Sequence, residues 1–231
     1  MLRTTLIHQI QWADQICILD LGSKDGTQSF CRSVLRPQDV YIRREKNTIP
    51  TLGFSEAMNA IMAVASMDWI YVAGASYCLD WKQREMVKPT LASATRDVLD
   101  IETQHIPITT TVHQIEEITE TELPTRVERH RVFVRRGSGI VYKGYIHEEL
   151  FLGETNVVEM ADVVPLRRFH FSKVAQRQTK QAYMIIRAYH NPELQAYTNK
   201  WWYTVFVPEN FEYLTQLASE CEKELKENGD I

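Results

Sequence analysis

The first 72 residues alternate short apolar runs with amphipathic stretches. This alternation limits the possible folds more than any other feature of the sequence. In order, the pattern predicts a helix at residues 2–13, a strand at 16–19, a helix at 27–35, a strand at 40–42, a helix at 56–66 and a strand at 69–72. Nearly continuous apolar strands separated by helices are typical of a parallel sheet covered on both faces. The sequence therefore predicts an α/β fold with a central, mostly parallel sheet flanked by helices.

From about residue 100 the pattern changes. Residues 105–115 and 126–136 alternate like half-exposed strands, and an acidic run separates them. A helix is predicted from Ser172 to about Tyr189, and another after Pro208. We therefore expect a main domain over residues 1–190 and a C-terminal helical extension, 191–231, packed on it.

Composition excludes some classes of protein. The 26 Lys and Arg residues against 30 Asp and Glu give a net charge of −4, which argues against nucleic-acid binding by the protein as a whole. Four scattered cysteines favour a reducing compartment over a disulfide framework. Neither a signal peptide nor an apolar run long enough for a membrane span is apparent, so a cytoplasmic protein is expected.

The run DLGSKDGT, residues 20–27, follows the first predicted strand. A carboxylate at the carboxyl end of a parallel strand lies where open α/β sheets bind ligands, and Gly22 and Gly26 permit close backbone approach. Asp20 can accept bonds from ribose hydroxyls or a base N–H. A tight turn with an Asx-type cap explains the same residues equally well.

Four segments in order carry a resemblance to a known family. DLGSKDGT resembles the D-x-G-S-T-D-G-T segment of family 2 glycosyltransferases, which have the nucleotide-diphospho-sugar transferase (GT-A) fold. Residues 53–72 resemble the family's F-S-x-A-R-N helix and the strand after it. Residues 131–150 are similar to its R-L-F-R-R…I-H-E segment, and residues 170–189 to its H-(Y/F)-G-Y loop and following helix. The resemblance implies that a sugar is transferred from a nucleotide sugar to an acceptor, by direct displacement at the anomeric carbon if the protein is of the inverting type.

The resemblance also implies site residues. The predicted nucleotide-binding residues are Asp20, Gly22, Ser23, Asp25 and Asn59. Within the I-H-E segment, Glu148 is the predicted catalytic base and His147 its catalytic neighbour. A purely structural role, with His147 a polar residue at a strand end, is the alternative.

The sequence departs from the family at its metal site. Where the family has D-A-D-E carboxylates that hold a divalent cation on the donor diphosphate, this chain has Gly74, Ala75, Ser76 and Tyr77. Mg²⁺ and Mn²⁺ prefer carboxylate oxygens, so no metal ligand is assigned and metal-independent transfer is expected. Positive side chains would then stabilise the leaving diphosphate. The basic residues in or beside the matched segments are Arg135, Arg136, Lys143, Arg167, Arg168 and Lys173. Arg136 and Lys173 are the predicted diphosphate ligands.

Two further points remain from the sequence. The family's sheet has a strand ahead of the first helix, and no such run precedes residues 2–13 here. Either the sheet lacks this strand, or another segment, a second copy or a partner chain fills its place. An uncovered edge favours pairing with another chain. His105, His113 and His130 lack metal-ligand spacing, are expected on strands and receive no role.

Two functions therefore stay open. The first is a glycosyltransferase that uses a nucleotide sugar and an unknown acceptor. The alternative is a catalytically inactive relative that keeps the fold as a binding or assembly module, and a viral origin of such a protein stays open.

Overall fold

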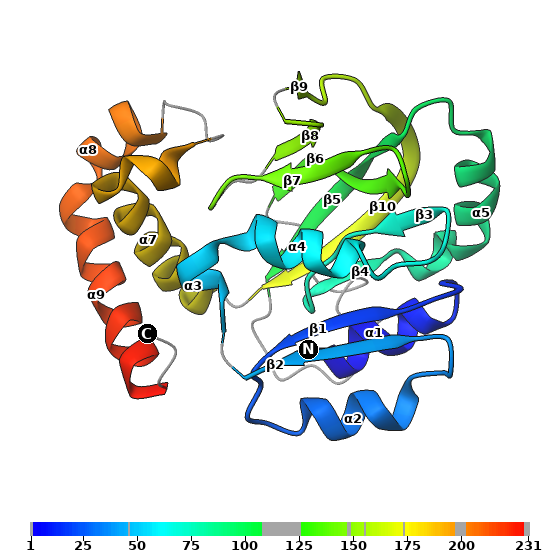
Figure 1. Cartoon of the computed structure of the whole chain (residues 1–231), viewed down its shortest axis with the longest axis horizontal. Coiled ribbons are helices and arrows are strands. Elements are labelled where there is room, and N and C mark those ends of the chain that lie inside the picture. The colour runs from blue at the N-terminus through cyan, green and yellow to red at the C-terminus, as the bar shows by residue number, and fades with distance from the viewer. Residues whose placement is uncertain are drawn as a thin grey trace.

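The protein has a mixed α/β fold, shown as a computed structural model in Figure 1. The structure describes residues 2–45, 47–107, 126–146, 149–154, 156–172, 174–196 and 202–228. Its strands form a two-stranded, a five-stranded and a three-stranded sheet within these ranges.

The N-terminal elements follow the predicted helix and strand order, apart from one short additional helix at residues 49–52. They are α1 (Leu2–Ile10), β1 (Cys17–Leu21), α2 (Thr27–Val34), β2 (Val40–Arg44), α3 (Ile49–Leu52), α4 (Phe54–Met62) and β3 (Trp69–Tyr71). Strands β1 and β2 pair in parallel, in a register that joins Cys17 to Val40 and Leu21 to Arg44. The predicted alternation of helices and strands over residues 2–72 is confirmed. It could be predicted because it depends on local periodicity.

The central sheet is mixed, so the prediction of a mostly parallel sheet is wrong. Its strand order is β3-β6-β5-β10-β4, with β4 (Tyr77–Leu79), β5 (Val98–Pro107), β6 (Arg126–Arg135) and β10 (Asp162–Ser172). Only β5 and β10 pair in parallel. Strand β6 lies antiparallel between β3 and β5, and β4 lies antiparallel on β10. The strands in the second half of the chain, in which polar and apolar residues alternate, therefore belong to the central sheet itself.

The prediction that the early strands are buried on both faces is also wrong. All three residues of β3, and every residue of β1 except Asp20, are only half-buried. Within the described residues β1 pairs only with β2, and β3 only with β6. In the part of the chain that the structure describes, each of the two strands therefore has one unpaired edge.

A small antiparallel sheet covers one side of the central sheet. It consists of β7 (Ile140–Lys143), β8 (Glu149–Leu152) and β9 (Asn156–Val157). Its residues Ile140, Tyr142 and Leu150 pack with Val98 and Val134 of the central sheet, and Met58 and Met62 of α4 lie against them. A second cluster on the central sheet includes Val87 of α5 (Arg84–Ser93), which follows the 3₁₀ turn η1 (Trp81–Gln83).

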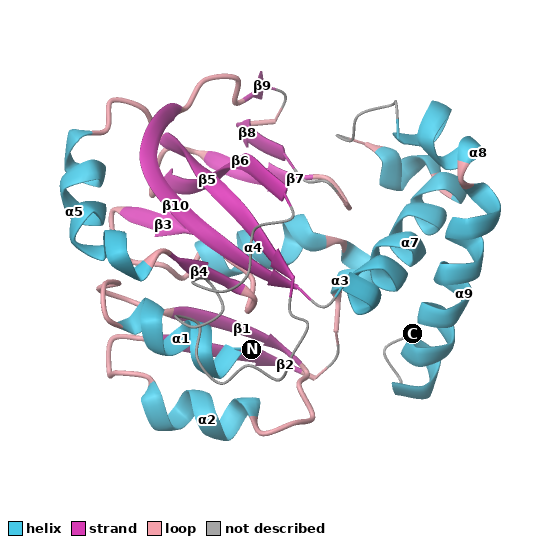
Figure 2. Ribbon diagram, turned by 180° about the vertical axis from the view of Figure 1, so that it is seen from behind, coloured by secondary structure: helices cyan, strands magenta, loops and turns pink. Residues whose placement is uncertain are grey.

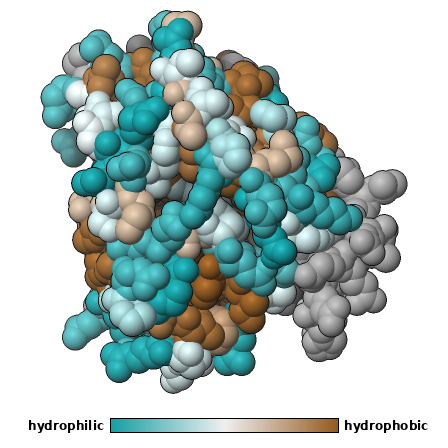
Figure 3. Space-filling model, turned by 90° about the vertical axis from the view of Figure 1, so that its right-hand side faces the viewer, coloured by the Kyte–Doolittle hydropathy of each residue, from teal (hydrophilic) through white to brown (hydrophobic). Residues whose placement is uncertain are grey.

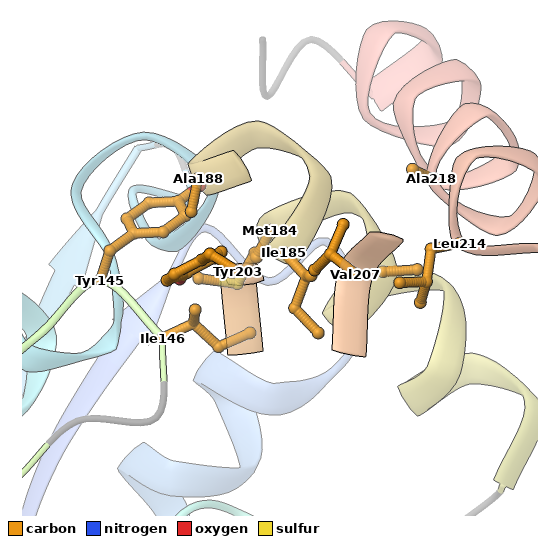
Figure 4. Packing of buried hydrophobic residues seen from close by; sticks show 10 residues of the cluster. Tyr145, Ile146, Met184, Ile185, Ala188, Tyr203, Val207, Leu214 and Ala218 are labelled. Atoms are coloured by element: carbon orange, nitrogen blue, oxygen red, sulfur yellow. The ribbon is translucent and has the colours of Figure 1, made fainter. Parts of the chain in front are cut away.

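The C-terminal helices form a separate layer beside the sheets (Figure 2). They are α7 (Val174–His190), the turns η2 (Pro192–Gln195) and η3 (Trp202–Phe206), α8 (Val207–Glu209) and α9 (Phe211–Asn228). Figure 4 shows side chains of α7, α8 and α9 meeting around Val207. Tyr145 and Ile146, which follow β7, join the same cluster, so this layer is packed onto the rest of the molecule. Helix α7, predicted within the main domain, packs against α9.

All four cysteines are free thiols. Among the described helices, none is both long enough and apolar enough to cross a membrane.

Candidate active site

The corner after β1 is built around the buried carboxylate of Asp20. Its Oδ1 accepts a hydrogen bond from the backbone N–H of Ser23 at 2.8 Å, and its Oδ2 accepts one from the hydroxyl of Tyr41 on β2. Gly22 has a φ of 83°, a left-handed conformation that disfavours a side chain. The corner therefore turns sharply and holds the carboxylate between two strands.

The charge of this corner follows from its hydrogen bonds. Burial raises the pKa of Asp20, but the bonds from Tyr41 and Ser23 together with the charge of Arg43 outweigh it, so the pKa lies below its usual value. Burial and the bond to the carboxylate raise the pKa of Tyr41 to about 12. At neutral pH the pair is an ionised carboxylate beside a protonated phenol. Such a carboxylate can accept a further hydrogen bond from a ligand.

Asp25 and Gly26 lie between this corner and α2. The exposed Asp25 accepts a hydrogen bond from the backbone N–H of Thr27 at 3.0 Å, and bonds to Thr27 lower its pKa. A side chain at Gly26 would come within 3.1 Å of the Arg3 guanidinium of α1. Helix α1 therefore begins directly against the corner.

The residues at the family's carboxylate positions form a turn after β3. The backbone N–H of Tyr77 bonds to the carbonyl of Gly74 at 3.0 Å, and the carbonyl of Ala75 accepts a bond from the Thr5 hydroxyl of α1 at 2.8 Å. The nearest following carboxylate, Asp80, is buried and paired with Arg167. Among the described residues no group of three or more His, Cys, Asp or Glu is arranged to hold a metal ion.

Beside this turn lies a cluster of polar side chains on four adjacent strands of the central sheet. We call it the histidine cluster; its members are Tyr77, Thr103, His105, Glu128, His130, Arg168 and His170. The strand register brings these residues to one face, because Thr103 is opposite both Glu128 and Arg168, and His105 is opposite His170. His105 and His170 are 6% and 5% exposed, so their ring nitrogens depend on protein partners.

Hydrogen bonds join the histidine cluster into a chain. Nε2 of His105 lies 2.7 Å from Oε1 of Glu128, and Nδ1 of His105 lies 3.0 Å from Nδ1 of His170. The His170 ring stacks on Tyr77, with ring centroids 4.1 Å apart and planes inclined by 6°. Arg168 is 5% exposed, donates to the Thr103 hydroxyl at 2.8 Å and lies 4.2 Å from the centroid of the Tyr77 ring. Within the described residues Arg168 forms no ion pair with a carboxylate.

His130 lies at the more open side of the cluster. Its Nδ1 is 2.9 Å from the Thr103 hydroxyl, and its Nε2 is 3.3 Å from Glu128. Burial, followed by the charge of Arg168, lowers the pKa of His130 to about 4 despite the opposing effect of Glu128. The imidazole is therefore neutral at physiological pH.

The corner and the histidine cluster lie at the same edge of the molecule. The side chain of Gln15, before β1, accepts bonds from Ser66, before β3, so these strands start side by side. Helix α1 lies at the other ends of β1 and β3. Its Arg3 lies beside Gly26, and the hydroxyl of its Thr5 donates to the carbonyl of Ala75. Because β3 and β5 are both antiparallel to β6, and β10 is parallel to β5, all these strands end at one edge. We call it the carboxyl edge.

The other predicted residues lie elsewhere or have structural partners. Asn59 on α4 donates to the carbonyl of Tyr142 and accepts from its N–H, both at 2.8 Å, so its amide ties α4 to β7. Arg136 bonds through its backbone to Asp68 and through Nε to Met67, before β3, at the end of the sheet opposite the carboxyl edge. Asp20, Gly22, Ser23 and Asp25 are brought together; Asn59 and Arg136 do not join them.

Three predicted residues, His147, Glu148 and Lys173, lie outside the residues that the structure describes. The remaining basic residues are engaged elsewhere: Arg135 pairs with Asp97, and Lys143 with Glu154. Of the basic residues singled out from the sequence and described here, Arg168 is the one buried at the carboxyl edge beside Tyr77.

Sequence reasoning missed the histidine cluster. The sequence predicts His105 and His130 on strands and gives them no role, because they lack metal-ligand spacing. The available signal is the presence of polar residues two apart on three strands, at 103 and 105, 128 and 130, and 168 and 170. These residues can be recognised as a cluster only when the strand register is known, because strand pairing places them side by side.

A separate hollow of about 410 Å³ lies between α1, η1 and α5. Its lining consists of His8, Gln11, Trp81, Lys82, Arg84 and Glu85. The side of the molecule that bears α5 is largely hydrophilic, with scattered hydrophobic residues (Figure 3). Because β4 runs antiparallel to β10, the hollow lies beyond the end of β4 and away from the carboxyl edge.

The scan against protein families finds no matching family model, and the search of curated proteins finds no matching relative. The class that the fold defines is a mixed α/β protein.

Proposed function

We propose that the protein is a glycosyltransferase that binds a nucleotide sugar at the carboxyl edge and transfers its sugar without a metal ion. The observation that carries the proposal is that the Asp20 corner and the histidine cluster share this edge, with the turn at residues 74–77 between them. Ligands of α/β sheets bind outside the carboxyl ends of the strands. An ionised Asp20 suits the hydroxyls or N–H groups of a nucleoside.

Arg168 supports the metal-independent form of this activity. Arg168 is buried and has no carboxylate partner among the described residues. A buried guanidinium without such a partner is costly, and a nearby anion offsets that cost. Its position over Tyr77 places a permanent positive charge at the turn where the family has its cation. Charge-assisted hydrogen bonds from Arg168 would stabilise the negative charge on a leaving diphosphate.

Isothermal calorimetry with uridine, guanosine and cytidine diphosphates, each with and without Mn²⁺, tests the proposal. We expect one of them to bind equally with and without Mn²⁺, and to lose binding in Asp20→Asn. Asp14→Asn is the matched control, because this exposed carboxylate bonds to Lys88 before β1, away from the corner. Failure of every diphosphate to bind the folded protein would contradict the proposal.

Among the described residues β1 and β3 each have an unpaired edge, which favours a second candidate, a binding or assembly module. Such edges are templates for an added strand from another chain. If this function holds, sedimentation velocity will show association as concentration rises, and hydrogen exchange at β1 and β3 will slow with it. A monomer at all concentrations, with exchange at these strands unchanged, argues for the transferase instead.

A further inference from the structure

The hollow between α1, η1 and α5 lies apart from the proposed transferase site. Its volume of about 410 Å³ falls within the range of small-molecule sites, about 300–1,000 Å³. Such sites are usually lined mainly by apolar side chains. Here the lining combines the indole of Trp81 with polar side chains of both charge signs. A polar ligand that has one apolar face therefore suits this hollow better than a wholly apolar ligand.

Trp81 lies in a turn that is fixed on both sides. Asp80, before it, is 1% exposed and pairs with Arg167 of β10. The side chain of Gln83, after it, accepts a hydrogen bond from the backbone N–H of Arg167 at 2.7 Å and donates one to the carbonyl of Pro165 at 3.1 Å. Groups that are held in place before binding lose little conformational entropy when a ligand arrives. The indole is therefore preorganised at the wall of the hollow.

The indole of Trp81 keeps surface for a ligand, because it is only half-buried. Among the described residues its ring contacts are with His8 and Phe169, at centroid distances of 5.7 Å and 5.4 Å and interplanar angles of 41° and 39°. Neither of these rings stacks flat on the indole. Within the same residues the indole N–H has no acceptor, so this donor can bond to a ligand.

The polar side chains of the lining come from both helices. Gln11 directly follows α1, and its Oε1 accepts a hydrogen bond from the guanidinium of Arg84, the first residue of α5. The side chain of Glu85 is 92% exposed, and its carboxylate lies 3.7 Å from Nε of Arg84. His8 and Lys82 complete the lining and also take part in other interactions. The amide N–H groups of Gln11 and the oxygens of Glu85 thus offer donors and acceptors beside the indole.

We propose that this hollow is a carbohydrate site that binds a pyranose ring of a saccharide. One face of a pyranose consists of C–H groups, and this face can lie on the indole of Trp81. Sugar hydroxyls both donate and accept hydrogen bonds. They can donate to Glu85 and accept from Gln11, so both kinds of polar group in the lining find a partner.

An inorganic anion fits the same lining less well. The carboxylate of Glu85 repels it and offsets the attraction of Arg84, and the indole offers it no favourable contact. The carbohydrate site goes beyond the proposed transferase and does not depend on it, because the hollow lies away from the carboxyl edge.

NMR of the ¹⁵N-labelled protein during titration with cellobiose, maltose and chitobiose tests the proposal through the indole N–H signals of the five tryptophans. The Trp81 signal is identified by its absence in Trp81→Phe. We expect at least one disaccharide to shift this signal saturably and to leave that of Trp69, on β3, in place. No shift with any of the three at millimolar concentration would overturn the proposal. A shift caused by inorganic phosphate and by no disaccharide would overturn it as well.

Variants of Trp81 test the contact with the indole by calorimetry with the disaccharide that binds. Trp81→Ala should weaken binding about tenfold or more, because it removes the aromatic face. Trp81→Phe keeps an aromatic ring and should retain most of the affinity. Met86→Ala is the matched control, because Met86 is exposed on α5 and does not line the hollow. Equal affinities of Trp81→Ala and Met86→Ala would reject the proposed contact.

Glu85→Gln distinguishes a sugar from an anion, and its exposed side chain makes misfolding no concern. Replacing a charged acceptor by a neutral one should weaken sugar binding roughly fivefold. The same change would tighten the binding of an anion, because it removes a negative charge. Unchanged or tighter binding of the disaccharide would contradict the proposal. Failure of the wild-type protein to bind any nucleoside diphosphate would reject the transferase alone, because the disaccharide titration is read at Trp81.

Discussion

At the scale of single residues, Asn59 shows how a predicted ligand can have a structural role. Both polar atoms of its amide are bonded to the backbone of Tyr142. Asn59→Ala leaves a donor and an acceptor on β7 unsatisfied, so we expect a loss of about 1–3 kcal/mol in the free energy of unfolding. Nucleotide affinity should not change.

Urea denaturation and calorimetry on the same variant check this prediction. Asn59→Asp keeps the acceptor for the Tyr142 N–H but loses the donor, so its stability should lie between those of the wild type and Asn59→Ala. Weaker nucleotide binding at full stability would show that Asn59 contacts the ligand.

His130 gives a pH dependence whose sign can be worked out. Its pKa is about 4 in the folded protein and near 6.5 when unfolded, so the unfolded chain binds the proton more tightly. The contribution of His130 to stability is therefore complete above pH 6.5 and is lost as the pH falls toward 4. His130→Gln should make the decline between pH 7 and 5 shallower, because Gln does not titrate.

Denaturation midpoints measured across that range test the effect, with His190→Gln on the exposed end of α7 as the control. The range lies above the region where Asp20, whose pKa is lowered, gains its proton. An identical decline in His130→Gln and wild type would rule out His130 as its source.

At the scale of elements, β1 and β2 should open more readily than the central sheet. They form a two-stranded sheet of half-buried residues, whereas Leu99, Ile101 and Ile106 of β5 are almost completely buried. Two-stranded sheets are marginally stable, and local opening follows low burial. Hydrogen exchange followed by mass spectrometry should show faster exchange in β1 and β2 than in β5. Equal protection would indicate that another segment covers the open edge.

The elements also show what the sequence can predict. Helices α1, α2 and α4 and strands β1 to β3 follow local periodicity, so they were found with small errors at their ends. Strand order is not local: Tyr71 and Tyr77 are six residues apart, yet β3 and β4 form opposite edges of the five-stranded sheet. The same limit applies to the site. The Asp20 corner is one continuous run, whereas His105, Glu128 and His170 are brought together only by pairing between distant strands.

At the scale of the whole molecule, the C-terminal helices should unfold together with the sheets. Met184 is fully buried in a cluster that joins α7 and α9 to Tyr145 and Ile146 (Figure 4). Met184→Ala should cost about 2–5 kcal/mol and lower a single transition seen by every probe. The exposed Met86→Ala on α5 is the control and should change stability by less than about 0.5 kcal/mol. Separate transitions for helix and sheet would show that the two layers fold independently.

The central claim is that the Asp20 corner and the histidine cluster form one site at the carboxyl edge. Its most direct test is NMR of the ¹³C-histidine-labelled protein during titration with uridine diphosphate and guanosine diphosphate. We predict that the diphosphate that binds shifts the His105 and His170 signals and leaves the His190 signal in place. In Asp20→Asn none of the three signals should shift. Saturable binding without a change at His105 and His170, or binding that survives Asp20→Asn, would contradict the claim.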